Sequence, residues 1–248
     1  MKLTIMTYNI QHGVDHLKRL QDPGLTDVEL IDLDRFVQAI RPFHPDILSL
    51  NEVRGASTKP GFCDETRYLA EKLDMPYHFF AQALDETGHG PYGNALLSRL
   101  PFSSIEKIMI PDPAEKRPGG HYETRCLIHA VFDADGHPLH VLSTHFGLEP
   151  DEAELAVSAA LSHTDPHNAS LIMGDFNLTP DSPVLAPLLT IYQDSATLLP
   201  EHTLTYPSHA PEIKIDYILG CGPLRFTEAL VPKQIVSDHF PYITQIEV

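Results

Sequence analysis

The stretch 171-LIMGDFNLT-179 places an aspartate and an asparagine two positions apart, directly after a run of large apolar residues. In an extended backbone, residues i and i+2 point to the same side. Asp175 and Asn177 are therefore expected to present two oxygen-bearing side chains to one place, with Phe176 on the other side. Because Asp, Asn and Gly are also common turn residues, this stretch by itself fits a simple turn equally well.

Other apolar stretches of the chain end in a similar way. Polar residues of metal-ligand or acid–base type stand at or just after the ends of these stretches: Asn9, Asn51, Glu52, His145, Asp238 and His239. The segment IKIDYIL carries Asp216 inside an apolar strand. Because burying an unpaired carboxylate is costly, Asp216 needs a partner, and a histidine is the obvious candidate. One such ending would fit a turn, whereas the repeated pattern predicts one shared cleft.

Length and composition favour one domain. The chain has 248 residues, its Pro and Gly residues are spread throughout, and no Ser- or Gly-rich tract separates two halves. An apolar content of 42% is ordinary for a protein with a sizeable core. We therefore expect residues 1–248 to form a single domain.

The charge balance is strongly acidic, with 17 Lys and Arg against 34 Asp and Glu and a formal net charge of −17. Dispersed negative charge repels polyanions, so broad electrostatic binding to duplex nucleic acid is disfavoured. No apolar run approaches the ~20 residues that span a bilayer, and MKLTIMTYNIQHG is interpreted as a first strand, not as a secretory signal. Three distant cysteines favour neither a disulfide framework nor a zinc site, so a reducing cytoplasm is expected.

The fifteen histidines are scattered along the chain. HPLH at 137–140 and HTDPH at 163–167 are interpreted as loop or surface histidines, and the sequence contains no HExxH.

Hydrophobic periodicity predicts a mixed α/β fold. Amphipathic helices are expected at 28–41, 64–74 and 151–163. Strands are expected at 2–10, 46–50, 77–82, 94–99, 104–110, 123–132, 138–144, 169–173, 213–219, 225–231 and 241–247. The block of consecutive strands in the middle of the chain argues against simple β–α alternation. Two mixed sheets packed face to face, with helices outside, accommodate this order better.

The chain resembles the endonuclease/exonuclease/phosphatase superfamily, whose fold is that of pancreatic-type deoxyribonuclease. The motifs that carry the resemblance run from end to end: TYNIQHG at 7–13, PDILSLNEV at 45–53, YGNALLSR at 92–99, ETR at 123–125, STHF at 143–146, GDFN at 174–177, KIDYIL at 214–219 and SDHFP at 237–241. The resemblance implies a four-layer α/β sandwich and Mg²⁺-dependent cleavage of phosphoester bonds. Asn51 departs from the family, whose members often have Gln before the Glu, and residues 13–27 align with no functional motif.

The resemblance also implies roles for individual residues. Glu52 is expected to be the principal Mg²⁺ ligand, with Asn9 and Asp238 beside it and Mn²⁺ as an alternative ion. Asp175 would deprotonate the attacking water, and Asn177 would donate hydrogen bonds to the transition state.

The remaining site residues follow from the same comparison. Asp216 is expected to hold the His239 imidazole and favour its charged form, and His145 is a second phosphate donor. Arg125 and Asn94 are candidates for the substrate wall. Their alternatives are an ion pair of Arg125 with Glu123 and a turn cap at Asn94.

Three functions remain open. The first is a metal-dependent phosphodiesterase or phosphatase acting on a small or lipid phosphoester, which the acidic charge favours. The second is a nuclease, which would require folding to gather basic residues at the cleft mouth, for example Arg54, Lys59, Arg67, Lys116 and Arg117. The third, an inactive binding module, is disfavoured because every expected catalytic residue type is present.

Overall fold

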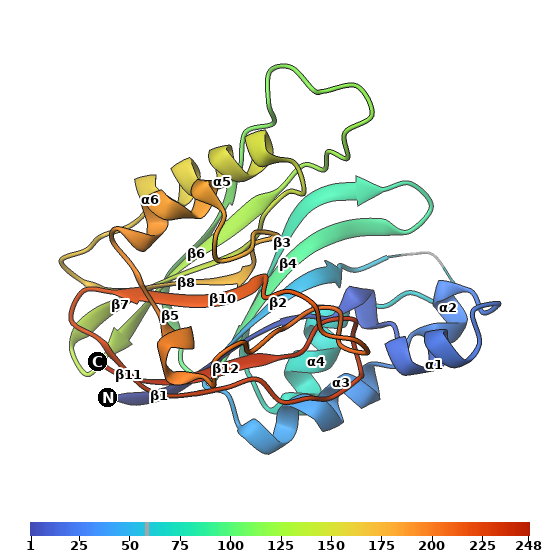
Figure 1. Ribbon diagram of the computed structural model, residues 1–248. Helices are drawn as coiled ribbons and strands as arrows, with labels where there is room; N and C mark the ends of the chain where they lie inside the picture. Colours follow the sequence, from blue (N-terminus) through green and yellow to red (C-terminus); the bar gives the residue numbers. More distant parts are fainter. Residues whose placement is uncertain (58–59) are drawn as a thin grey trace.

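The computed structural model describes residues 1–57 and 60–248 and contains two six-stranded mixed sheets (Figure 1). The first sheet consists of β1 Lys2–Asn9, β2 Ile47–Arg54, β3 Tyr77–Glu86, β4 Gly90–Ser98, β11 Arg225–Leu230 and β12 Tyr242–Glu247, in the spatial order β11-β12-β1-β2-β4-β3. The second consists of β5 Phe102–Met109, β6 Cys126–Ala134, β7 His137–His145, β8 Ala169–Asp175, β9 Gln193–Asp194 and β10 Asp216–Cys221, in the order β5-β6-β7-β8-β10-β9.

Each sheet has a parallel pair at its centre, β1 with β2 and β7 with β8, and its other pairs are antiparallel. The carboxyl ends of two parallel strands lie at the same edge, so the register places Asn9 beside Asn51 and His145 beside Asp175. Strand β10 runs antiparallel to β8, and its first residue, Asp216, is therefore paired with Asp175. The predicted polar endings thus meet at one edge of the two sheets.

Helices cover the outer faces of the sheets. They are α1 His16–Gln21, α2 Asp27–Leu30, α3 Leu33–Ile40, α4 Glu65–Leu73, α5 Pro150–Ser162 and α6 Ala186–Leu189. Figure 1 shows α3 and α4 on the first sheet and α5 and α6 on the second. Phe36 of α3 packs its ring against Tyr8 of β1 at a centroid distance of 5.8 Å. The three apolar clusters, one between the sheets and one under each helical layer, confirm the four-layer sandwich.

The helix predicted at 28–41 is two helices in the structure. The backbone of Ile31 is extended and pairs with Val14, which interrupts the helix between α2 and α3. Asp32 then caps α3, because its carboxylate accepts a hydrogen bond from the backbone N–H of Arg35 at 3.3 Å. The apolar spacing continued across this break, so periodicity alone did not reveal it. Helix α1 lies in the stretch 13–27, for which the sequence predicted no element.

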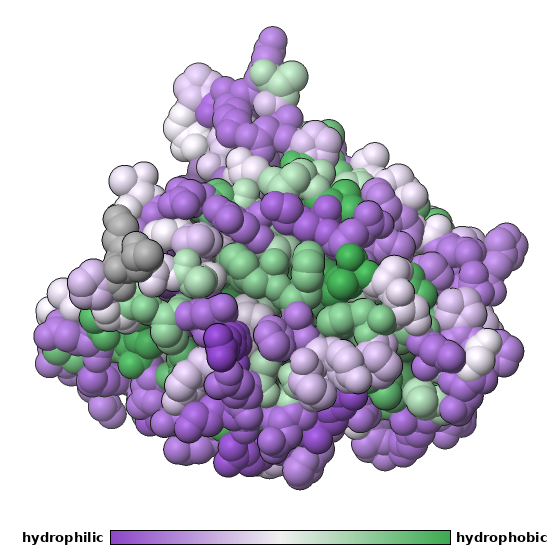
Figure 2. All heavy atoms as spheres, turned by 180° about the vertical axis from the view of Figure 1, so that it is seen from behind, coloured by the Kyte–Doolittle hydropathy of each residue, from purple (hydrophilic) through white to green (hydrophobic). Residues whose placement is uncertain are grey.

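Figure 2 shows mainly hydrophilic side chains on the rear face, with a less polar area in its middle. Among the residues described, no helix has the length and apolarity needed to cross a membrane.

Asn51 links the two sheets beneath their common edge. Its Nδ2 donates to Asn94 Oδ1 in the same sheet and to the Thr144 carbonyl in the other, both at 2.9 Å. Its Oδ1 accepts from the backbone N–H of Asp175 at 2.9 Å. Gly174 permits this close approach, since a Cβ there would lie 1.8 Å from the Thr144 carbonyl oxygen. One fully buried carboxamide therefore positions the end of β8 against β2 and β7.

We expect Asn51→Ala to lower the free energy of unfolding by about 2–4 kcal/mol, because each buried polar group left without a partner costs about 1–3 kcal/mol. Urea denaturation followed by circular dichroism would measure the change. Asn168→Ala is the matched control, since the Asn168 side chain donates to Asp165 alone and lies in a half-buried loop. Equal losses for the two variants would contradict the role of Asn51 as the link between the sheets.

Candidate active site

The edge at which the polar strand ends meet contains a cavity of about 520 Å³. Seven of the ten residues singled out from the sequence line it: Glu52, Arg125, His145, Asp175, Asn177, Asp238 and His239. Asn9, Asn94 and Asp216 lie behind this wall and act on the cavity through other residues.

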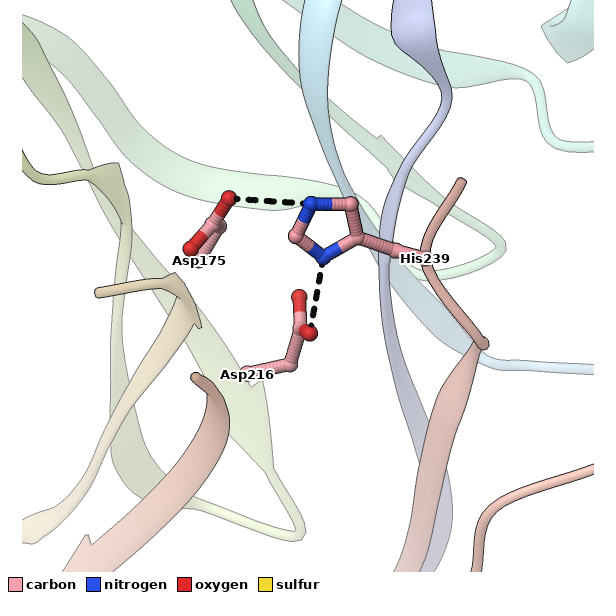
Figure 3. Close-up of side chains that lie close together, drawn as sticks. All are labelled: Asp175, Asp216 and His239. Carbon is pink, nitrogen blue, oxygen red and sulfur yellow. Dashed lines mark hydrogen bonds and ion pairs between the residues drawn. The ribbon is translucent and has the colours of Figure 1, made fainter. Parts of the chain in front are cut away.

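His239 lies between two aspartates (Figure 3). Its Nδ1 is 2.9 Å from Asp216 Oδ2, and its Nε2 is 3.5 Å from Asp175 Oδ2. All three side chains are almost completely buried. Asp216 was expected inside an apolar strand, but the strand starts at Asp216. This position, together with the antiparallel register, is what brings its carboxylate to the same edge as Asp175.

The charges of this group follow from its burial. Burial alone would lower the pKa of His239, but the adjacent Asp216 and Asp175 carboxylates outweigh it and raise the pKa to about 10. The imidazole is therefore positively charged at neutral pH. Burial raises the pKa of Asp175 to about 7, although the His239 cation opposes this shift. A carboxyl group with a pKa near neutrality suits a general base.

His145, unlike His239, is uncharged. Its pKa lies well below the usual value because it is buried and because the Arg125 guanidinium and the His239 cation are close. Arg125 Nη1 lies 3.2 Å from His145 Nδ1, and a guanidinium can only donate. On the other side of the ring, Nε2 lies 3.5 Å from Asp175 Oδ2. The uncharged His145 ring therefore faces the cavity through Nε2.

Asn177 does not continue the extended strand assumed from the sequence. Its φ is 51°, in the left-handed region, and its backbone N–H donates to Asp175 Oδ1 at 3.0 Å. Its Nδ2 donates to the Phe146 carbonyl at 3.0 Å and lies 3.1 Å from His145 Nε2. Phe176 points into the core and stacks on Phe146. Asp175 and Asn177 therefore both reach the cavity, as expected. Asn177 does so because the chain turns after Asp175, and not because an extended strand continues.

Glu52 stands on a β-bulge between Leu50 and Val53, with a φ of 56°. The bulge turns its carboxylate into the cavity, where Asp238 also lies. Burial, and then the charge of Asp238, raise the pKa of Glu52. In the described part of the chain neither carboxylate forms an ion pair with Lys or Arg. Two carboxylates without a basic partner therefore share one wall of the cavity.

Asn9 does not offer its oxygen to the cavity, as the expected metal ligand would. Its Oδ1 accepts from the backbone N–H of Gln11 at 3.0 Å. Its Nδ2 donates to Glu52 Oε1 at 2.9 Å and to Asp175 Oδ2 at 3.1 Å. Because a backbone N–H and two carboxylates fix this orientation, Asn9 bridges Glu52 and Asp175 by donating to both.

Asn94 does not form part of the substrate wall. It is 3% exposed, its Oδ1 accepts from Asn51, and its Nδ2 donates to the Cys126 carbonyl at 3.0 Å. Arg125 lines the cavity as expected and also forms the alternative ion pair, with Glu123 Oε2 at 2.9 Å from its Nη2.

Sequence reasoning missed several cavity residues. His12 follows Asn9 within TYNIQHG, and its Nδ1 lies 3.7 Å from Glu52 Oε2. Burial and the neighbouring Arg54 lower the pKa of His12 to about 4, so it is uncharged. Tyr206 packs its ring 4.7 Å from that of His239. The sequence could have pointed to His12, because it lies in the motif TYNIQHG together with Asn9. Tyr206 reaches the cavity from a loop that belongs to no motif.

Four of the five basic residues that a nuclease would require, those that the structure describes, do not line the cavity. Arg54 is 1% exposed and pairs with Glu86. Arg67 pairs with Glu71, Lys116 with Asp112 and Arg117 with Glu149. Lys59 lies outside the described residues. Among the cavity residues of the described chain, Arg125 is the one Lys or Arg.

One further group has metal-ligand spacing. The ligand atoms of Asp175, Asp216 and His239 lie within 4.8 Å of one another. Both imidazole nitrogens are already directed at carboxylates, and the charged ring would have to lose a proton before it could bind a metal ion.

Comparison with known proteins gives one family. The sequence profile described as Endonuclease/Exonuclease/phosphatase family matches residues 6–239. A search of curated proteins gave no match. An endonuclease/exonuclease/phosphatase from Beutenbergia cavernae DSM 12333 superposes with a TM-score of 0.78 at 22% identity, over 100% of this chain and 72% of that one.

Two other similar structures carry functional titles. The mannosyl-6-phosphatase Bt3783 of Bacteroides thetaiotaomicron VPI-5482 gives a TM-score of 0.75 at 13% identity, over 99% of this chain and 100% of that one. A humanized D. rerio TDP2 gives 0.67 at 18% identity, over 100% and 99%. At such identities these structures support the fold alone. The profile match over nearly the whole sequence shows that this chain belongs to the endonuclease/exonuclease/phosphatase family.

Proposed function

We propose that this protein is a metal-dependent hydrolase that cleaves a phosphoester bond of a small or lipid-derived substrate. The observation that carries the proposal is the set of side-chain nitrogens around the Asp175 carboxylate. Asp175 Oδ2 lies within 3.5 Å of nitrogens of Asn9, His145 and His239. A base and several N–H donors thus converge on a cavity that also holds the carboxylates of Glu52 and Asp238.

The donor set of the cavity fits a hard divalent cation. Carboxylate oxygens are the ligands that Mg²⁺ prefers, whereas thiolates and imidazoles suit softer ions. Glu52 and Asp238 would hold the ion, since the raised pKa of Glu52 reflects burial and the negative charge of Asp238, which a cation would relieve. Asn9 and Gln11 orient these carboxylates by donating to Glu52 and Asp238 at 2.9 and 3.0 Å. When bound, the ion supplies charge neutralisation at the phosphoryl and leaving oxygens.

The protein's own groups divide the chemistry between them. Asp175 accepts a proton from the attacking water, and the new P–O bond forms as the ester P–O bond breaks. His239, held in its charged form by Asp216, directs Nε2–H at a phosphoryl oxygen. His145 and Asn177 donate from the adjacent wall and stabilise the charge that develops in the transition state. In this proposal Arg125 donates to His145 Nδ1, which leaves the ring proton on Nε2. Asn177 then directs its two N–H groups at the Phe146 carbonyl and at the phosphoryl group.

The cavity mouth favours a compact or lipid-derived substrate. The carboxylates of Glu52 and Asp238, which have no Lys or Arg partner in the described chain, give the wall negative charge that repels an extended polyanion. Leu148 and Ile213, 54% and 36% exposed, line the same cavity and offer apolar surface to an organic alcohol group. The fold neighbour titled as a mannosyl-6-phosphatase supports a small substrate, and the TDP2 neighbour supports the nuclease alternative.

Two further proposals concern the chain as a whole. Residues 1–248 form one domain, a proposal supported by the single core between the two sheets. The protein works in the cytoplasm, a proposal supported by the free thiols of Cys63, Cys126 and Cys221.

A substrate screen tests the proposed function. Phosphomonoesters, phosphodiesters, sphingomyelin-type lipids and oligonucleotides would be incubated with the protein and Mg²⁺, and released product would be measured. We expect turnover of a small or lipid phosphoester that exceeds turnover of oligonucleotides. Preferential cleavage of oligonucleotides would instead identify a nuclease.

Removal of divalent cations should abolish turnover, because the Glu52 and Asp238 carboxylates are the proposed ligands of a hard ion. We expect activity to disappear in EDTA and to return on addition of Mg²⁺ or Mn²⁺. Full turnover in metal-free buffer would refute the metal-dependent mechanism.

Asp175→Asn should lower kcat by about 10²–10⁴-fold, because it removes the general base while keeping the size of the side chain. The Tm should change little, and steady-state kinetics with the best substrate of the screen would measure the effect. Thr179→Ala is a control on the following loop, where the hydroxyl contacts Asp181 at the surface. A variant that retained a tenth of wild-type activity would exclude Asp175 as the base.

Duplex DNA should not bind measurably at physiological salt. Each phosphate neutralised by Lys or Arg contributes a slope of about −0.9 in log K against log salt, and the described cavity wall has Arg125 as its one such residue. Fluorescence anisotropy with intact and abasic duplexes over a KCl series would test this. Tight binding with a steep salt dependence would favour the nuclease.

A further inference from the structure

A histidine cluster lies on the outer face of the second sheet, away from the candidate active site. His129 of β6 is opposite Glu106 of β5, and His140 of β7 is diagonal to His129, on the same face. His163 follows the last residue of α5, and its ring centroid lies 6.1 Å from that of His129. Along β7, His140 is five residues from His145, a separation of about 17 Å. The cluster brings together HPLH and HTDPH, two motifs that have no part in the proposed function.

Hydrogen bonds fix the protonated nitrogen in two of these rings. His129 Nδ1 faces Glu106 Oε1 at 3.5 Å, and a carboxylate only accepts. His163 Nδ1 lies 2.8 Å from the Ala159 carbonyl, which also only accepts. In both rings the proton is therefore on Nδ1 and the lone pair is on Nε2. In His129 this lone pair faces His140 Nδ1. Metal-binding histidines in proteins are held in the same way, with the second nitrogen donating to a carboxylate or a carbonyl.

The spacing of the first two rings also fits a shared ion. His129 Nε2 and His140 Nδ1 lie 3.1 Å apart. Two imidazole nitrogens bound tetrahedrally to one Zn²⁺ at about 2.0–2.1 Å are about 3.3 Å apart. His129, whose side chain is 16% exposed, is set into the surface, and its pKa is lowered by burial and by the neighbouring histidines, so it is uncharged and able to ligate.

We propose that His129, His140 and His163 form a Zn²⁺ site at the C-terminal end of α5, with Glu106 orienting His129. His129 and His163 ligate through Nε2, and His140 ligates through Nδ1 once its proton is on Nε2. The ligand atoms of the three rings do not yet lie within 4.8 Å of one another. His163 reaches the ion by a rotation of its side chain, which exchanges its hydrogen bond to the Ala159 carbonyl for the metal. The bound ion would join the end of α5 to β6 and β7. Imidazole ligands select Zn²⁺ over Mg²⁺, so this site is chemically distinct from the carboxylates of the cavity.

Equilibrium dialysis of the full chain against Zn²⁺ in a large excess of Mg²⁺ tests this site, because Mg²⁺ occupies the oxygen ligands and leaves the imidazoles. We expect one Zn²⁺ per chain. His129→Ala should weaken Zn²⁺ binding by at least about 100-fold, and Glu106→Gln by about 10–100-fold through the loss of the outer carboxylate. Zn²⁺ should also raise the Tm of the wild type and not that of His129→Ala.

His137→Ala is the matched control, because His137 is an exposed histidine at the start of β7 and should leave Zn²⁺ affinity unchanged. Co²⁺ absorption gives an independent readout, since the wild type should show the intense visible bands of a tetrahedral site and His163→Gln should lose them. If His129→Ala does not fold, the Zn²⁺ affinities of Glu106→Gln and His163→Gln are compared with that of the wild type instead. The site is refuted if no Zn²⁺ binds in excess Mg²⁺, or if the binding is equal in the wild type and these variants. Both outcomes are independent of any phosphoesterase assay.

Discussion

The position of the candidate site depends on the buried carboxamide of Asn51, which joins the two sheets at the edge where their central parallel strands end. A sandwich of two sheets packed through apolar side chains tolerates small sliding of one sheet over the other, because dispersion contacts have little directionality. Hydrogen bonds from one side chain to Asn94, Thr144 and the backbone of Asp175 remove that freedom. They fix the distance between Glu52, which follows Asn51 in the first sheet, and Asp175, which ends a strand of the second.

The same edge keeps two histidines in opposite charge states a short distance apart. His239 lies between the carboxylates of Asp175 and Asp216 and is charged, whereas His145 lies against the Arg125 guanidinium and is neutral. Both rings are buried, so burial alone would have made both neutral. The neighbouring charges decide the outcome, so His239 carries a positive charge at the cavity at neutral pH and His145 adds no second one.

The two ends of the second sheet carry different ligand chemistries. At the carboxyl end of β7 lies the cavity in which Glu52 and Asp238, without a Lys or Arg partner in the described chain, are the proposed ligands of a hard cation. Near its other end, the imidazoles of His129 and His140 lie on the outer face with two ring nitrogens 3.1 Å apart. The acidic surface affects both sites, because it raises the local concentration of divalent cations and repels polyanions such as duplex DNA.

The sequence by itself determined the four-layer fold, the order of the strands along the chain and the presence of Glu52, Asp175, Asp238 and His239 at one edge. These features follow from local periodicity and from strand endings, which short-range chemistry encodes. Only the tertiary structure decided that Asn9 donates to its carboxylate neighbours, that Asn94 is an internal link and that the helix at 28–41 breaks at Ile31. The tertiary structure also decided that Asn177 reaches the cavity through a left-handed turn and that Asp216 does so by starting an antiparallel strand. The orientation of an amide or the burial of a histidine depends on partners distant in sequence, and hydrophobic spacing carries no information about those partners.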